Sequence, residues 1–384
     1  MVQRIRHVKP ELIRWARERS GQNPDYLGKR FKKLAAWEQG ESYPTLKQLE
    51  EYAKATHVPL GYFFLPEPPI ERLPIADLRT VGNQWIGRPS PDLLDTFYTM
   101  QRRQDWLREE IIAYEAEPLD FVGGATLNDS PQGVGREMRR IIGFEEGWAA
   151  TVNTWQEAVN ELRFAIEKIG VMVFVNGVVG NNTKRILNVE EFRGFALCDE
   201  YAPLIFVNGA DSKSAQMFTL AHELAHIWLG ESGLSDLELI TRPTLEIEKW
   251  CNHAAAEFLV PEKELSKCWP HVKHDDRPFE TLARHFKVSP LVAGRRAMEL
   301  RLVSRDMFFD FYSDYVERDR KQRTGSRGGN FYKTQRIRLG EQFPLAVFHA
   351  AKEGRIGFKE AYDLTGLYGG TFQEYADQLG VALP

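Results

Sequence analysis

The sequence predicts an α+β protein that is mainly helical, and three observations carry this expectation. The first 66 residues divide into short helical segments separated by glycine and proline. Residues 218–230 form an apolar run of helical length that ends at a glycine. Strand-like segments are few and short, at residues 170–175 and 202–208. We therefore expect a helical N-terminal bundle, a core with a small sheet and a helical C-terminal region.

Residues 1–66 are expected to fold as a domain of their own. They carry 12 Lys/Arg against 7 Asp/Glu, whereas the whole chain has a net charge of −4. The sequence predicts four short helices in this domain: Pro10–Ser20, Pro24–Phe31, Lys33–Glu38 and Thr45–Thr56.

The segment 34–49 resembles the second half of an Xre-type helix-turn-helix domain. Such a fold presents one helix to the DNA major groove and sets basic residues against phosphates. Here the start of the recognition helix is compressed into Phe31–Leu34, and a shortened helix reads base edges poorly. Arg30, Lys32 and Lys33 are the candidate nucleic-acid contacts. DNA binding through residues 1–66 and protein docking by the same fold both stay open.

Residues 67–135 are predicted to form a proline-rich connector followed by a helix. Four prolines lie between Leu60 and Thr80, where helical periodicity is weak, so this part is expected to be extended. Apolar stripes then predict helices at about residues 90–120 and 145–170. Residues 170–175 predict a short buried strand.

His222, Glu223 and His226 form the pattern His-Glu-x-x-His inside the apolar run 218–230. Histidines four residues apart lie on one helix face, so both imidazoles can reach a single metal ion. Glu223 projects from a neighbouring part of that turn and can take a proton from a metal-bound water. The alternative is a core helix that happens to carry two histidines, but two unpaired buried imidazoles would be costly. The pattern predicts the metal-binding helix of a peptidase.

A catalytic zinc usually takes three protein ligands, and the extended pattern with a third histidine is absent. Residues 245–261 predict a second helix that is stopped by a proline. Glu248 and Asn252 lie four residues apart on it, so Glu248 can face the metal while Asn252 braces a histidine through its second nitrogen. The other candidate ligands of this helix lie on different faces or turns: Glu246, His253 and Glu257.

Together these segments resemble the ImmA/IrrE family of metallopeptidases. The residues that carry the resemblance are Asp199, the extended segment 202–208, the helix 218–226 and the segment 248–261. The resemblance covers about residues 150–300, and with the Xre-like start and the proline-rich bridge it extends over about residues 10–300. It implies a zincin-like fold with a glutamate as third ligand. It also implies a protein substrate that is a helix-turn-helix repressor, cut to release genes in a phage, mobile-element, stress or toxin–antitoxin circuit.

In the expected mechanism, a metal held by His222, His226 and Glu248 lowers the pKa of its bound water. Glu223 acts as general base on that water and passes the proton to the leaving amine. Two imidazoles and a carboxylate make Zn²⁺ the first choice and Mn²⁺ the alternative. The competing hypothesis is a non-proteolytic regulator that binds DNA or protein and uses the metal core as a sensor or docking platform. The intact base at Glu223 favours the enzyme.

A candidate substrate strand precedes the metal helix. The residues of this strand are Leu204, Ile205, Phe206, Val207 and Asn208. If they form an edge strand, a peptide substrate can add to it through main-chain hydrogen bonds. An ordinary buried strand is the alternative.

Residues 136–305 are assigned to the zincin-like metallopeptidase domain, and residues 306–384 to a basic loop and a helical C-terminal region. Helices predicted at 279–286 and 291–300 resemble a second helix-turn-helix pair. Residues 318–338 hold eight Lys/Arg and one acid. Such a run is either a solvated segment or a contact with nucleic acid or an acidic partner.

Composition excludes several classes of protein. The small net charge of −4 gives no global attraction to nucleic acid. The N-terminus lacks the apolar core of a signal peptide, and no apolar stretch approaches the roughly 20 residues that span a bilayer. Three cysteines without paired spacing are typical of a reduced compartment. We therefore expect a cytoplasmic protein with a protein substrate and no membrane partner, and leave its oligomeric state open.

Overall fold

The computed structural model divides the chain into two compact units, residues 1–74 with 86–96 and residues 75–85 with 97–384. The structure describes the following residues: 4–71, 73, 76–77, 80–81, 84–85, 89–235, 246–320 and 331–383.

The first unit is a bundle of short helices, as predicted. Its core is aromatic and aliphatic: Trp37 and Tyr52 are at most 2% exposed, and the Tyr52 hydroxyl donates to the Ile13 carbonyl at 2.9 Å. Thr45 and Gln48 form a reciprocal capping box at the start of the last α-helix. The helices of this bundle are α1 (Pro10–Arg19), α2 (Pro24–Arg30), α3 (Leu34–Glu38), α4 (Leu46–Thr56) and the 3₁₀ helix η1 (Leu60–Phe64).

The second unit is built around a mixed five-stranded sheet with the strand order β1-β9-β7-β8-β4. β8 pairs in parallel with β4 and antiparallel with β7, while β9 pairs antiparallel with β7 and in parallel with β1. These strands are β1 (Ala76–Asp77), β4 (Met172–Asn176), β7 (Gly194–Leu197), β8 (Leu204–Asn208) and β9 (Gly233–Ser235). Two small ribbons lie outside the sheet: β2 (Thr80–Val81) with β3 (Gln84–Trp85), and β5 (Val178–Val179) with β6 (Asn182–Ile186).

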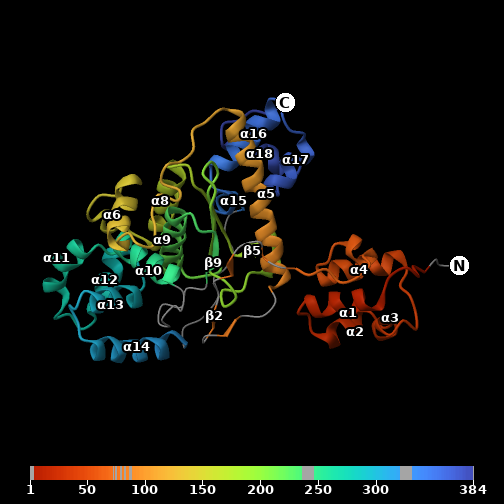
Figure 1. Ribbon diagram of the computed structural model, residues 1–384, viewed down its shortest axis with the longest axis horizontal. Helices are drawn as coiled ribbons and strands as arrows, with labels where there is room; N and C mark the ends of the chain where they lie inside the picture. The colour runs from red at the N-terminus through yellow and green to blue at the C-terminus, as the bar shows by residue number, and fades with distance from the viewer. Residues whose placement is uncertain are drawn as a thin grey trace. The chain divides into compact units, whose positions relative to one another are not determined.

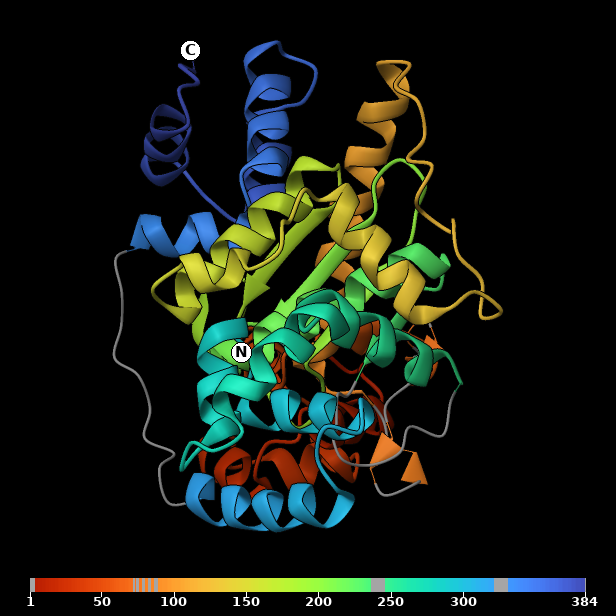
Figure 2. The ribbon, with the colours of Figure 1, turned by 90° about the vertical axis from the view of Figure 1, so that its left-hand side faces the viewer.

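Helices cover both faces of this sheet. On one face Val173, Ile205 and Val207 join the core cluster of α8 (Trp155–Lys168) and α9 (Lys213–Leu229). On the other face Phe195 packs against Phe97 of α5 (Pro91–Ala113), with ring centroids 5.5 Å apart. Figure 1 shows α8 and α9 on one side of the sheet and α5 on the other, and Figure 2 shows the yellow and green helices in front of the strands. The mainly helical α+β class is confirmed.

The substrate-strand prediction was wrong. β8 is an interior strand with β4 on one side and β7 on the other, and each of Leu204, Ile205, Phe206, Val207 and Asn208 is buried. Because both of its edges are already paired, no peptide can add to it. The buried-strand alternative is confirmed. The sheet extends beyond β7 through β9 and β1, and these pairings join segments far apart in the sequence.

The predicted helix at 145–170 is confirmed over α8 (Trp155–Lys168), but the chain leaves the helix between α7 (Trp148–Thr151) and α8. Thr154 caps the start of α8 in a reciprocal capping box with Glu157. The predicted helix at 90–120 ends earlier, at Ala113. Residues 321–330, in the middle of the basic segment 318–338, lie outside the described residues.

The remaining helices of the second unit lie between α5 and α8 or after α9 in the sequence. None of the helices in the described part of the chain is both long and apolar enough to cross a bilayer. The bounds are α6 (Pro131–Ile141), α10 (Glu246–Leu259), α11 (Glu262–Val272), α12 (Pro278–Phe286), α13 (Pro290–Glu299), α14 (Arg305–Arg320), α15 (Phe331–Leu339), α16 (Gln342–Lys352), α17 (Phe358–Thr365) and α18 (Gly370–Gln378).

Candidate metal centre

Helix α9 carries the His-Glu-x-x-His pattern at the centre of the second unit. Ser212 caps its start by accepting the backbone N–H of Ala215, and Gly230 ends it in the left-handed conformation at φ 70°. The helix is buried on nearly all sides between the sheet, α8 and α10. A helix enclosed in this way tolerates polar side chains only where they have partners.

The two histidines of α9 meet Glu248 of α10. The Nε2 atoms of His222 and His226 lie 3.1 Å apart, and the Glu248 carboxylate lies 3.2 Å from the first and 3.1 Å from the second. Both histidines are fully buried, and Glu248 is 6% exposed. The predicted third ligand therefore lies where the helix spacing placed it.

These three side chains fit a metal ion. Ligand atoms bound at 2.0–2.1 Å in a tetrahedral site are about 3.3 Å apart, close to the separations found here. His222 Nδ1 lies 3.1 Å from Asn252 Oδ1, so Nδ1 carries the hydrogen and Nε2 has a lone pair. That lone pair faces the carboxylate of Glu248 and His226, and a cation bound between the three side chains would satisfy all three. Among the described residues, this is the group of His, Cys, Asp and Glu side chains that could hold a metal.

The electrostatics of the site show how a cation would be accommodated. Burial lowers the pKa of His222. Burial acts in the same direction on His226, but Cys251 and Glu248 outweigh it and raise its pKa well above the usual value. The pKa of Glu248 is lowered although burial opposes this, because the two histidines favour the carboxylate. The cluster therefore holds a proton before a metal binds, and metal binding displaces it.

Two further side chains of α10 support the histidines. Asn252 lies one turn beyond Glu248 and bonds the outer nitrogen of His222. The fully buried thiol of Cys251, three residues beyond Glu248, lies beside His226. The role predicted for Asn252 agrees with this contact. The spacing of three residues between Glu248 and Cys251 places the thiol on the same helix face.

The carboxylate of Glu223 lies between the metal helix and strand β7. It is fully buried, and a Cβ atom added at Gly194 would lie 3.0 Å from Glu223 Oε1 and 2.5 Å from Thr219 Cγ2. Gly194 therefore leaves the space that the glutamate occupies. Sequence reasoning missed this residue, because nothing in the local sequence indicates which glycine of a strand faces the metal helix.

The basic candidates of the first unit lie on its surface. Arg30 is the last residue of α2, and Lys32 and Lys33 lie in the turn that precedes α3; all three are exposed. Helix α3 has only five residues. DNA binding by this turn stays a prediction.

Two segments of the second unit match models of known protein families. Residues 166–298 match the family model described as the IrrE N-terminal-like domain, a peptidase family. The match supports a metallopeptidase-type function. Residues 339–378 match a family model described as a domain of unknown function, DUF8813. No curated protein matches the chain. The first match contains all four residues of the centre, His222, Glu223, His226 and Glu248, and it supports the resemblance to the ImmA/IrrE family.

Proposed function

We propose that this chain is a zinc-dependent endopeptidase that cuts a specific protein substrate. The observation that carries the proposal is the convergence of His222, His226 and Glu248 within 3.2 Å of one another beside a buried Glu223. Two imidazoles and one carboxylate leave a fourth position for water or substrate, as in catalytic zinc sites. The match of residues 166–298 to a peptidase family agrees with this chemistry.

Each residue of the metal centre would have a separate role in the reaction. His222, His226 and Glu248 hold the zinc, which when bound activates a water molecule and polarises the scissile carbonyl. Glu223 accepts the proton of the attacking water and returns it to the leaving amine. Asn252 keeps His222 in the tautomer that leaves Nε2 available. The buried surroundings strengthen each of these interactions by excluding bulk water.

The substrate we propose is a helix-turn-helix transcriptional repressor. The resemblance to the ImmA/IrrE family supports this choice, and cleavage would then control genes of a phage, mobile-element, stress or toxin–antitoxin circuit. The N-terminal bundle is proposed to bring the enzyme to its target, by docking on the substrate or by contacting DNA through Arg30, Lys32 and Lys33.

The test compares the protein N-termini of cells that express the wild type with those of cells that express Glu223→Gln. The substitution removes the base but keeps the three ligands, so we expect metal content to be unchanged and cleavage to fall by about 10²–10⁴-fold. Terminal-peptide mass spectrometry should then find new N-termini with the wild type alone, and their sequences would name the substrate.

Identical terminal profiles, with the metal retained in both proteins, would contradict the peptidase proposal. That result would favour a non-proteolytic regulator with the metal core as a sensor. Binding of DNA and of protein partners by residues 1–66 would then be the property to measure.

A further inference from the structure

The outer nitrogen of the second histidine lacks the kind of partner that the first has. His222 Nδ1 lies 3.1 Å from Asn252 Oδ1. His226 is fully buried, and its Nδ1 has no oxygen or nitrogen partner within the described part of the chain. Its Nε2 lies 3.1 Å from the Glu248 carboxylate, so a neutral ring that binds a metal through Nε2 carries its hydrogen on Nδ1. A buried N–H of this kind needs an acceptor.

The thiol of Cys251 lies beside this imidazole. Cys251 belongs to α10 and is fully buried. Its sulfur lies outside the group of ligand atoms that could share one ion, which among the described residues consists of His222, His226 and Glu248. The sulfur is therefore next to a metal ligand without being one. Because a thiol sulfur is a weak hydrogen-bond acceptor, it can meet the need of Nδ1.

One face of α10 supplies all the partners of the two histidines. Glu248, Cys251 and Asn252 lie at positions i, i+3 and i+4 of this helix, so their side chains project to the same side. Glu248 contacts both imidazoles at their inner nitrogens. Asn252 contacts the outer nitrogen of His222, and Cys251 is the residue of this face that lies beside His226.

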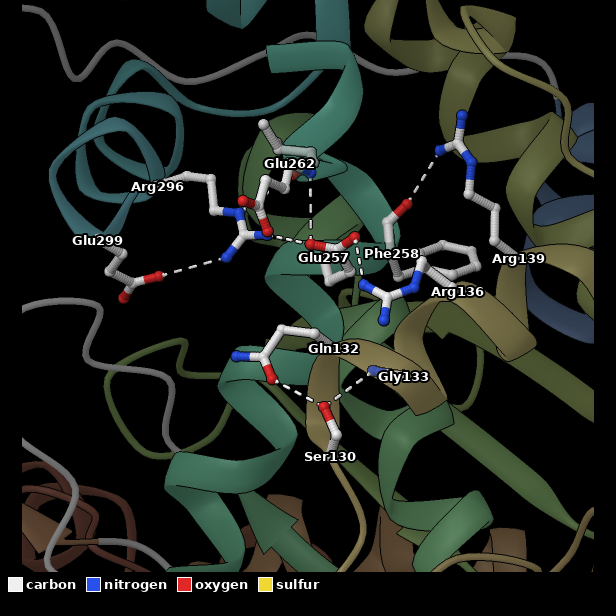
Figure 3. Close-up of polar contacts among 11 residues, drawn as sticks. Ser130, Gln132, Gly133, Arg136, Arg139, Glu257, Phe258, Glu262, Arg296 and Glu299 are labelled. Atoms are coloured by element: carbon white, nitrogen blue, oxygen red, sulfur yellow. Dashed lines mark hydrogen bonds and ion pairs between the residues drawn. The ribbon is translucent and has the colours of Figure 1, made fainter. Parts of the chain in front are cut away.

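The second half of α10 is held by buried charge pairs. Arg296 of α13 pairs with Glu257 and donates to the Val260 carbonyl at 3.1 Å. Arg136 of α6 pairs with Glu257 at 3.2 Å. Figure 3 shows Arg296 and Arg136 reaching the Glu257 carboxylate from two sides. Because breaking a buried charge pair is costly, α10 does not rotate to bring another side chain to His226 when Cys251 is replaced.

We propose that Cys251 is a positioning residue for His226, whose Nδ1 hydrogen its sulfur accepts so that Nε2 stays directed at the metal. The inference rests on the proposed zinc peptidase and extends it to a residue that touches neither the metal nor the substrate. Partners of this kind commonly change metal affinity by about 10–100-fold.

A thiol in a protein core can also serve only as a packed apolar group, and the two roles order substitutions differently. Cys251→Ala leaves no acceptor, whereas Cys251→Ser keeps one but buries a hydroxyl. If Cys251 only packs, serine should be no better than alanine. If Cys251 positions His226, serine should restore what alanine loses.

The test measures the zinc affinity of the full-length protein by competition with a chromogenic chelator. Cys251→Ala should bind zinc about tenfold more weakly than the wild type, and Cys251→Ser should bind it nearly as well as the wild type. Cys198→Ala is the matched control, because the Cys198 thiol contacts the backbone carbonyl of His226, at 3.5 Å, rather than its ring. Cys251→Val, which also lacks an acceptor, makes the same comparison if the alanine variant does not fold.

Two results of this titration would overturn the inference. One is a serine variant that binds zinc as weakly as the alanine variant. The other is a loss in Cys198→Ala as large as that in Cys251→Ala, because the Cys198 contact does not orient the ring.

Cobalt(II) in place of zinc separates this inference from the proposed function, because its visible absorption bands report ligand geometry without any cleavage. Cys251→Ala should change these bands and Cys251→Ser should restore them, also on a Glu223→Gln background. A sulfur-to-cobalt charge-transfer band in the wild type would make Cys251 a ligand and overturn the positioning role. A wild type that cuts no protein but shows the expected order of variants refutes the peptidase and leaves the role of Cys251 standing.

Discussion

The Nδ1 atom of His222 and the Oδ1 atom of Asn252 are 3.1 Å apart, and this single contact decides which nitrogen of the histidine faces the metal. An amide oxygen can only accept, so the hydrogen of the neutral imidazole stays on Nδ1. Glu248 and Asn252 are one turn apart on the same helix, so α10 fixes the positions of both the metal ligand and the residue that orients His222. The metal affinity of the site thus depends on a residue that does not bind the metal.

We predict that Asn252→Ala lowers zinc affinity about 10–100-fold, because His222 loses the partner that orients its ring. Competition with a chromogenic chelator measures the affinity directly. Asn252→Asp should keep the affinity near that of the wild type, since a carboxylate accepts the same hydrogen bond. His253→Ala is the control on the neighbouring face of α10. Equal affinities for Asn252→Ala and His253→Ala would show that Asn252 does not hold the ligand.

The residues of the metal centre could be predicted because their relation is local. His222 and His226 lie within one turn, as do Glu248 and Asn252, and helix geometry alone places each pair on one face. Gly194 could not be predicted as the residue beside Glu223, because the two meet through packing of a strand on a helix.

At the scale of elements, α6 and α10 approach so closely that only glycine fits between them at one position. A Cβ atom at Gly135 would lie 2.5 Å from the Ala254 carbonyl and 3.2 Å from the backbone nitrogen of Phe258. A Cβ atom at Gly133, on the same helix, meets nothing closer than 3.5 Å. Helix α10 carries Glu248, so this contact also positions the third metal ligand.

We predict that Gly135→Ala destabilises the protein by about 1–3 kcal/mol, because the added methyl forces two backbones apart. Gly133→Ala should be neutral or stabilise by about 0.5 kcal/mol, because it only restricts the unfolded chain. Urea unfolding of the two variants gives both values. If Gly135→Ala were as stable as Gly133→Ala, α6 and α10 would have to lie further apart than in this structure.

Helices could be predicted where capping and apolar periodicity act locally, whereas the order of the strands in the sheet could not. The helices of the first unit and the metal helix follow from apolar spacing and from breaks at glycine and proline. The interior position of β8 depends on β9 and β1, which come from residues 233–235 and 76–77. Nothing in the segment 202–208 indicates that its second edge is occupied.

At the scale of the second unit, the region that matches the domain of unknown function is joined to the peptidase core at a buried carboxylate. Glu167 of α8 is 5% exposed and lies against Gly340, at the start of that region. Arg163, one turn earlier, donates to the Ile337 carbonyl at 2.9 Å. Burial raises the pKa of Glu167 to about 7, with Arg163 and Arg336 opposing the shift and Glu341 adding to it.

This buried glutamate makes the stability of the second unit depend on pH. In the unfolded chain the pKa of Glu167 is 4.5, so between pH 4.5 and 7 the folded state holds a proton that the unfolded state has released. Its contribution to stability is therefore complete below pH 4.5 and is lost as the pH rises to about 7. A shift of this size corresponds to a free energy of unfolding on the order of 3 kcal/mol.

We predict that Glu167→Gln abolishes this pH dependence, because glutamine keeps the shape of the protonated acid without ionising. Denaturant unfolding at pH 5 and pH 8 should show the wild type losing stability relative to Glu167→Gln as the pH rises. Glu161→Gln, an exposed position on the same helix, should follow the wild type. Parallel pH profiles for wild type and Glu167→Gln would mean that Glu167 is ionised at its buried position. The junction between core and C-terminal region would then hold an ionised Glu167 that is stabilised by the charge of Arg163 rather than a protonated acid.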